Sequence, residues 1–430
     1  MQLLELIVSR SIANRADFLE FKDQFENRAR ALYGKENLPE LAELGALVTR
    51  RLSKYAPGAS LSVDFDELKA PAIPLPNAVV EIAEDEFPVP VRYTGHGLQR
   101  ALILALLEQL SLTENSNEQK KLEADGAGEQ RGNRSPGLIL AIEEPELYLH
   151  PARSRYLSKV LRTLARENEL DATSGAQIMC VSHSPYFVSV QNFDEVRVCR
   201  KIRGVAALPP ATRISGFTRL EAAQNLAAIY QRNKEEFTEA SFVARATPVL
   251  NSIVNEGLFA DVVVVVEGDS DVAALWAVQE QLGLQWDEKG VVVVPVGGKN
   301  NIDRAVVVFR GFGIPTYFLF DGDKAENDAG IEANKALLAL GGLDRADYPT
   351  QGVYDSCAAF ENNLEEYLKS VVGEGFDRLR SASAFQCGHD RPSKALKNSE
   401  VMAAFLVNAS NEGHRFDLLE NLTRRVTDLL

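Results

Sequence analysis

The stretch Asp261-Val262-Val263-Val264-Val265-Val266-Glu267-Gly268-Asp269-Ser270-Asp271 decides the fold, because five consecutive valines run straight into a group of acids. Continuous β-branched residues, rather than alternating ones, are typical of a strand that is covered on both faces of a parallel sheet. The apolar runs at 291–296 and 315–320 have the same form, with helical patterns between them. This alternation predicts an open α/β sheet.

Polar residues follow each of these three strands. Glu267 ends the first, Gly297-Gly298-Lys299-Asn300 follows the second, and Asp321-Gly322-Asp323 follows the third. The carboxyl ends of parallel strands meet at one edge, and in an extended chain Asp321 and Asp323 would point to the same face. Carboxylates this close repel one another, which predicts a Mg²⁺ or Mn²⁺ site and metal-assisted phosphodiester cleavage. The nuclease interpretation would be overturned if Glu267 lay far from the pair Asp321 and Asp323, or if a lysine or arginine neutralised that pair where ions should sit.

A simpler interpretation of the same acids is structural. Aspartate at the end of a strand often caps a helix or forms a turn. Asp269, Ser270 and Asp271 could all cap the helix that follows the first strand. The metal-site interpretation rests on the polar residues at the ends of all three strands taken together.

With its Glu-Gly, Gly-Gly-Lys-Asn and Asp-x-Asp motifs in this order, the second half resembles the Toprim fold of topoisomerases, bacterial primases and the OLD (overcoming lysogenisation defect) nucleases. The resemblance implies that Glu267 acts in acid/base or metal chemistry and that Asp321 and Asp323 hold a divalent metal. It also implies that Asp271, four residues after the glutamate, binds a second metal.

The resemblance extends more thinly beyond the third strand. Phe360-Glu361-Asn362-Asn363-Leu364-Glu365 is similar to a Leu-Glu segment of OLD proteins, which makes Glu361 and Glu365 candidate metal ligands. An amphipathic helix with exposed glutamates would explain the same residues. Lys394 stands where such nucleases carry a late lysine that stabilises phosphate charge, and a solvated surface lysine is the alternative.

In the first half of the chain, an apolar strand at 137–142 delivers Glu143 and Glu144, which is the form of a Walker B segment. The strand Ile178–Val181 then delivers Ser182-His183-Ser184-Pro185. The segment from Glu143 to Pro151, followed by His183, resembles the ABC-type ATPases of the OLD group. The resemblance implies that Glu143 helps to place Mg²⁺, that Glu144 is the catalytic acid and that His183 is the switch histidine.

A second ATPase-like segment is Gly95-His96-Gly97-Leu98-Gln99-Arg100, which stands where the ABC signature is expected. Gly95, Gly97 and Gln99 are its candidate residues, at a turn whose amides could meet a phosphate. No GxxxxGK[ST] loop occurs in the chain. Either the chain is an N-terminally shortened form or its ATP site is incomplete, so we do not expect autonomous ATP hydrolysis.

The bulk composition leaves these predictions open. The chain has 430 residues and a net charge of −15, which counts mildly against nucleic-acid binding, although a local basic surface could still hold phosphates. The scattered cysteines indicate reduced thiols, and no stretch approaches the roughly 20 apolar residues of a membrane span. Without a signal-like start, we expect a cytoplasmic protein.

The predicted organisation has three parts. Residues 1–207 form the C-terminal part of an ABC-type ATPase with a mobile insertion at 113–136, residues 208–258 a helical connector, and residues 259–430 a Toprim domain with a helical extension. The leading hypothesis is a metal-dependent DNA endonuclease or nickase, homodimeric by analogy with the family, with a possible partner protein in phage defence or DNA repair.

Two alternatives remain open at this point. The first is another Toprim enzyme. A primase should contain a zinc-binding module, which the cysteine spacing does not support. A topoisomerase needs a nucleophilic tyrosine, which we do not identify. A non-catalytic ATPase-like regulator is the other.

Overall fold

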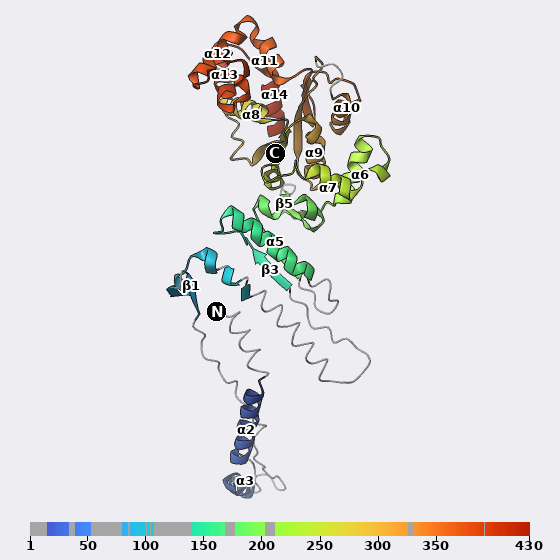
Figure 1. Cartoon of the computed structure of the whole chain (residues 1–430). Coiled ribbons are helices and arrows are strands. Elements are labelled where there is room, and N and C mark those ends of the chain that lie inside the picture. Colours follow the sequence, from blue (N-terminus) through green and yellow to red (C-terminus); the bar gives the residue numbers. More distant parts are fainter. Residues whose placement is uncertain are drawn as a thin grey trace. The chain divides into compact units, whose positions relative to one another are not determined.

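The structure is a computed structural model that describes residues 15–33, 39–52, 80–84, 87–99, 101–103, 105–106, 139–167, 177–202, 211–325, 330–390 and 392–430. The chain divides into two compact units, and Figure 1 shows the helices and strands of the chain. One contains Met1–Ala141 and Leu161–Met179, and the other contains Ile142–Val160 and Cys180–Leu430. The candidate site of the second half lies wholly in the second unit.

A five-stranded sheet organises the second unit, in the order β10-β11-β9-β7-β8. Its strands are β7 (Val262–Val266), β8 (Val291–Pro295), β9 (Thr316–Asp321), β10 (Gly352–Val353) and β11 (Cys357–Phe360). Strands β8, β7, β9 and β11 are parallel, and β10 pairs with β11 in the antiparallel direction. The predicted open, mainly parallel sheet is therefore confirmed.

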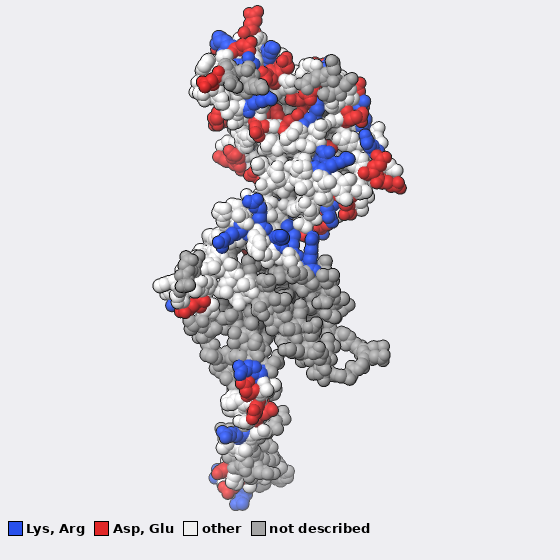
Figure 2. Space-filling view, in the orientation of Figure 1, with Lys and Arg blue, Asp and Glu red and all other residues white. Residues whose placement is uncertain are grey.

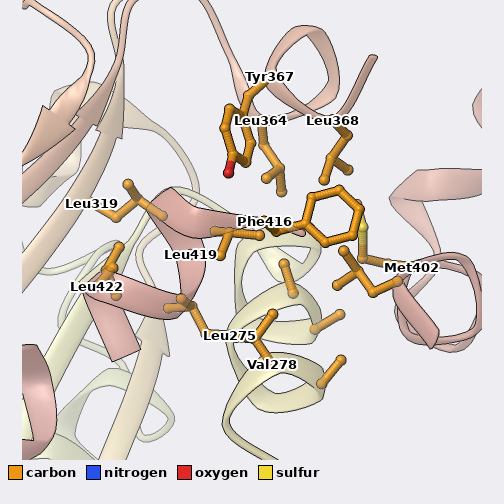
Figure 3. Packing of buried hydrophobic residues seen from close by; sticks show 14 of the residues in the cluster. Leu275, Val278, Leu319, Leu364, Tyr367, Leu368, Met402, Phe416, Leu419 and Leu422 are labelled. Carbon is orange, nitrogen blue, oxygen red and sulfur yellow. The ribbon is translucent and has the colours of Figure 1, made fainter. Parts of the chain in front are cut away.

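Both faces of this sheet are covered, as the valine run predicts. Val262, Val264 and Val266 belong to one hydrophobic cluster, and Val263 and Val265 belong to another. Residues of the following helices contribute to the first cluster, part of which is drawn in Figure 3: α8 (Asp269–Gln281), α11 (Leu364–Val372), α12 (Phe376–Gln386), α13 (Ser399–Asn411) and α14 (Asp417–Thr427). The second cluster takes residues from α6 (Arg219–Ile229), α7 (Glu239–Ala246), α9 (Ile302–Gly311) and α10 (Ile331–Leu340).

Two strands lie where the sequence indicated other structure. Residues after 330 were expected to be mainly helical, but Cys357–Phe360 forms β11 and pairs with β9. Within the predicted helical connector 208–258, Ala211–Ser215 forms β6 and pairs in the antiparallel direction with β5 (Val198–Ile202). Both strands are short, and their pairing partners, which local sequence does not show, stabilise them.

The remaining elements follow the sequence expectations more closely. The helices are α2 (Ala16–Tyr33), α3 (Pro39–Leu52) and α5 (Pro151–Glu167), and β1 (Glu81–Glu84) pairs with β2 (Phe87–Pro90). Strands β3 (Ile139–Glu143) and β4 (Gln177–Val181) are hydrogen-bonded neighbours. The predicted insertion at 113–136 lies outside the described residues. None of the described helices has the length and apolarity needed to cross a membrane.

Short 3-10 helices connect several of these elements. They are η1 (Val91–Tyr93), η2 (Pro185–Phe187), η3 (Val190–Glu195), η4 (Lys234–Glu236), η5 (Val254–Phe259), η6 (Lys299–Asn301), η7 (Gly373–Gly375) and η8 (Pro392–Lys397). The one that bears on the site is η6, because it follows β8 at the carboxyl edge of the sheet and begins at Lys299.

Candidate active site

The carboxylate of Glu267 joins the ends of three strands. Glu267 follows β7, and its Oε1 atom accepts a hydrogen bond of 2.8 Å from the backbone N–H of Asp321 at the end of β9. Its Oε2 atom accepts one of 3.1 Å from the backbone N–H of Lys299, which follows β8. The parallel order β9-β7-β8 brings these residues together, since β7 lies between the other two strands.

Burial changes the acidity of this cluster. Burial, together with the nearby Asp271, raises the pKa of Glu267 to about 7, although the N–H of Asp321 opposes the shift. The pKa of Asp321 is raised well above its ordinary value, first by burial and then by the negative charges of Glu267 and Asp271. Burial also raises the pKa of Asp271 to about 6. The acids therefore resist ionising together.

Asp271 makes the contact that the structural interpretation predicted. It lies in the first turn of α8, and its Oδ2 atom accepts a 3.0 Å hydrogen bond from the N–H of Gly268. Asp271 is nevertheless only 7% exposed. The Asp271 side chain thus caps helix α8 and also lies close enough to Glu267 to influence its pKa.

The chain turns sharply between Asp321 and Asp323, so the expectation of an extended chain here is wrong. Asp323 has a φ of 51°, in the left-handed region. The turn is held by β11: the N–H of Gly322 donates to Phe360 O (2.9 Å), and that of Asp323 donates to Asn362 O (3.0 Å). A Cβ atom at Gly322 would press against the carbonyl oxygens of Phe360 and Glu361. Glycine is therefore required at this position.

Lys299 lies inside the acidic cluster, which sequence reasoning missed. Its Nζ atom donates hydrogen bonds to Asp323 Oδ2 (2.6 Å) and to the backbone oxygen of Asp321 (3.0 Å), and its side chain is 7% exposed. The condition stated against the nuclease interpretation, a lysine that neutralises these acids, is therefore met at Asp323, whereas Lys299 contacts Asp321 only through its backbone oxygen. The signal was present in the sequence, as the lysine of the Gly-Gly-Lys-Asn motif that follows β8.

The donor chemistry fits a divalent cation. Glu267, Asp271, Asp321 and Asp323 offer hard carboxylate oxygens. Burial raises the pKa values of the first three, and the neighbouring acids raise those of Glu267 and Asp321 further. Within the described residues, no three acidic, histidine or cysteine side chains are arranged to enclose an ion. Asp323 instead contacts Lys299, and Asp271 accepts a hydrogen bond from the amide of Gly268.

Glu361 and Glu365, two of the candidate residues after the third strand, form ion pairs with basic side chains. Glu361 follows β11 and pairs with Lys324 Nζ at 2.5 Å, next to the Asp323 turn. Glu365 lies in α11 and pairs with Arg380 at 3.3 Å. Both glutamate side chains therefore contact basic residues rather than Asp321. Lys394 belongs to η8, and its side chain lies outside the described residues.

The ATPase-like acids end β3 as the Walker B pattern predicts. Glu143 is the last residue of β3, and Glu144 has a φ of 44° while its N–H donates to Val181 O (2.8 Å). The His183 Nε2 atom lies 4.0 Å from Glu144 Oε1. Glu146, which sequence reasoning left without a role, accepts a 2.9 Å hydrogen bond from the His183 N–H through Oε1.

The signature-like segment forms the start of a helix at His96. The backbone oxygen of Gly95 accepts hydrogen bonds from the N–H groups of Leu98 and Gln99. The side-chain amide of Gln99 donates to Val91 O (2.9 Å) and Thr94 O (3.0 Å). Gln99 therefore holds the preceding turn, and Gly97 lies within the first helical turn.

Two family models match parts of the chain. A family model described as "Overcoming lysogenization defect protein-like, TOPRIM domain" matches residues 258–323, which include Glu267, Lys299, Asp321 and Asp323. The chain carries an OLD-like Toprim domain. A second model, for an AAA ATPase domain, matches residues 19–188, which include Glu144 and His183.

Two curated relatives are named OLD nuclease. The one from Thermus scotoductus is 26% identical over 334 residues, covering 72% of this chain and 55% of the relative. The one from Escherichia phage P2 is 24% identical over 374 residues, covering 84% and 55%. The chain thus spans about half the length of the curated relatives it matches.

Solved structures similar to this chain include the C-terminal region of the Burkholderia pseudomallei OLD protein, with 18% identity and a TM-score of 0.28, covering 40% of this chain and 98% of that one. The C-terminal region of the Xanthomonas campestris pv. campestris OLD protein has 20% identity and a TM-score of 0.29, covering 40% and 95%.

Proposed function

We propose that this chain is a metal-dependent nuclease that hydrolyses phosphodiester bonds in DNA, with its active site around Glu267 and Asp321. The observation that carries the proposal is the half-buried Glu267 carboxylate, which receives hydrogen bonds from the backbone N–H groups of both Asp321 and Lys299. It sits at the edge of an OLD-like Toprim domain, where the acids of separate strands meet. We propose the domain limits 1–207, 208–258 and 259–430 for the ATPase-like part, the connector and the Toprim part.

The side chains divide the chemistry between them. Glu267, Asp271, Asp321 and Asp323 would hold Mg²⁺ or Mn²⁺. When bound, the cation supplies an activated water and stabilises the leaving oxygen. In the metal-free protein, the raised pKa of Glu267, about 7, places proton exchange at its Oε atoms near neutral pH. Glu361, Glu365 and Lys394 stay candidates for a supporting role, the two glutamates after release from Lys324 and Arg380.

A row of cations on α5 supports DNA as the substrate despite the charge of −15. Arg155, Lys159, Arg162 and Arg166 recur at helical spacing, and Figure 2 shows Lys and Arg side chains gathered over this helix. The opposite face is buried through Ser154, Leu157, Ser158 and Leu161. The row spans about 16 Å at 1.5 Å per residue, long enough to follow several phosphates.

The α5 row is tested by the salt dependence of DNA binding. Arg155→Ala/Lys159→Ala should weaken binding of a fluorescein-labelled duplex in EDTA and reduce the slope of log K against log [salt] by about 2. Both side chains are exposed, so the fold should be unaffected. Lys369→Ala/Arg424→Ala removes the same charge elsewhere and should leave the slope unchanged. An unchanged slope in the α5 variant would exclude this surface.

The ATPase-like part is proposed to be regulatory. Glu144 and His183 lie close together at the ends of β3 and β4, but the chain has no GxxxxGK[ST] loop to hold the β- and γ-phosphates. We therefore propose that ATP acts on this part only with phosphate-binding residues from a partner protein in a defence or repair system, and that two copies of the chain associate through this part. ATP-dependent dimerisation, measured by light scattering, tests this proposal.

The nuclease proposal is tested on supercoiled plasmid with Mg²⁺ or Mn²⁺. The wild-type protein should nick or linearise the plasmid, and Glu267→Gln should lower the rate by at least about 10²-fold. Glu288→Gln is the matched control, because Glu288 is exposed in the loop before β8. It should retain the wild-type rate.

Other outcomes favour the alternatives. Relaxation to closed topoisomers would indicate a topoisomerase-like Toprim enzyme. An unchanged plasmid in both metals would favour the non-catalytic regulator. Nicking that persists in Glu267→Gln would come from a contaminant or from another site, and would contradict the proposal.

A further inference from the structure

Lys299 is the buried cation of the acidic site. The exposed fraction of its side chain is 7%, and its Nζ atom contacts Asp323 Oδ2 at 2.6 Å and Asp321 O at 3.0 Å. Burying an ammonium group is costly unless it is paired and hydrogen-bonded. Lys299 meets both conditions, and it does so on a residue that would also bind the metal.

The surroundings leave room for this side chain and fix its backbone. Gly330 has a φ of 85°, and a Cβ atom there would lie 2.9 Å from Lys299 Cε and 3.0 Å from Nζ. The N–H of Lys299 donates to Glu267 Oε2 at 3.1 Å, and the N–H of Gly298 donates to Glu267 O at 2.9 Å. The lysine is therefore held between Glu267 at its backbone and Asp323 at its ammonium.

Within the described residues, Lys299–Asp323 is the ion pair formed by the four acids Glu267, Asp271, Asp321 and Asp323. The neighbouring Lys324 points to Glu361 instead. An ammonium and a divalent cation repel each other strongly at contact distance. The oxygen that holds Lys299 cannot hold a metal ion at the same time.

We propose that Lys299 is the internal counter-ion of the metal-free site, and that a divalent cation binds by displacing its ammonium from Asp323. The proposal rests on the metal site of the proposed function. The lysine stabilises the metal-free protein and weakens metal binding, because the ion pair must be broken first. It is a positioning residue that acts through Asp323.

The discriminating variant is Lys299→Met, which keeps the length of the side chain and removes its charge. The metal-free variant should unfold at a lower temperature than the wild type, since Asp323 loses its partner. Its Mn²⁺ affinity should rise by about tenfold, because no ion pair has to be exchanged. A merely structural lysine would lower stability without raising affinity.

The measurement is isothermal titration of the full chain with Mn²⁺, alongside thermal unfolding in EDTA. Lys369→Met is the matched control, because it removes an exposed α11 lysine that lies 3.9 Å from Glu366, and it should match the wild type in affinity. Equal or weaker Mn²⁺ binding by Lys299→Met overturns the counter-ion role while leaving the proposed function standing. No Mn²⁺ binding by the wild type contradicts both.

A second measurement needs no variant at position 299. Amine acylation followed by peptide mass spectrometry should label Lys299 slowly in EDTA and several-fold faster with saturating Mn²⁺, since displacement frees the buried ammonium. Lys369 should be labelled equally in both conditions. Unchanged labelling of Lys299, in a sample that binds Mn²⁺, also overturns the proposal.

Discussion

Glu267 carries the largest consequence at the scale of single residues, because its pKa of about 7 lies well above the ordinary value of 4.5. The folded protein therefore binds a proton between pH 4.5 and 7 that the unfolded chain has released. Linkage then requires the metal-free protein to lose stability as the pH rises through this range. Asp271, with a pKa of about 6 against 3.8, acts in the same direction.

We expect the unfolding free energy in EDTA to fall by on the order of 2 kcal/mol from pH 5 to pH 8. Urea denaturation at several pH values measures this, and Glu267→Gln should show a shallower dependence while Glu288→Gln keeps that of the wild type. Saturating Mn²⁺ should reverse the trend, because metal binding requires deprotonated carboxylates. A pH-independent stability without metal would show that Glu267 is not buried as described.

At the scale of elements, α10 holds the turn that carries Asp323. Asn334 is fully buried in α10, and its Nδ2 atom donates to Gly322 O and to Asp347 O, each at 2.9 Å. These bonds fasten the turn from one side, while β11 fastens it from the other through Phe360 O and Asn362 O. The position of Asp323 therefore depends on two elements that lie after it in the sequence.

Asn334→Asp should lower the unfolding free energy by about 2–4 kcal/mol, because it leaves the buried Gly322 oxygen and the partly buried Asp347 oxygen without their donor. It should also weaken Mn²⁺ binding by loosening the Asp323 turn. Asn225→Asp, at an exposed position of α6, serves as the control and should change neither quantity. Wild-type stability in Asn334→Asp would mean that the turn does not rely on α10.

At the scale of the whole molecule, the strands differ in how fully they are covered. All five residues of β7 are 0% exposed. In β3 and β4, by contrast, Ile139, Met179 and Val181 are 71%, 62% and 54% exposed. Backbone hydrogen bonds that are covered by packed side chains open least often.

Hydrogen exchange of the full chain should therefore be slowest in β7 and β9 and markedly faster in β3 and β4. Peptide-resolved mass spectrometry in EDTA measures the order. Adding Mn²⁺ should slow exchange around Asp321 and leave the peptides of β3 unchanged. Equal protection of β3 and β7 would contradict the described difference in burial.

The sequence by itself determined the parallel strands and the acids at their ends, because continuous valine runs and strand-end carboxylates are local signals. It also indicated the Walker B form of Glu143 and Glu144. Only the tertiary structure decided that β11 joins the sheet, that Asp323 turns out of the strand direction, and that Lys299 enters the acidic cluster. These depend on contacts between residues far apart in the chain, such as Lys299 with Asp323 or Gly322 with Phe360. Residue periodicity records which face of an element is buried, but it does not record which partner lies there.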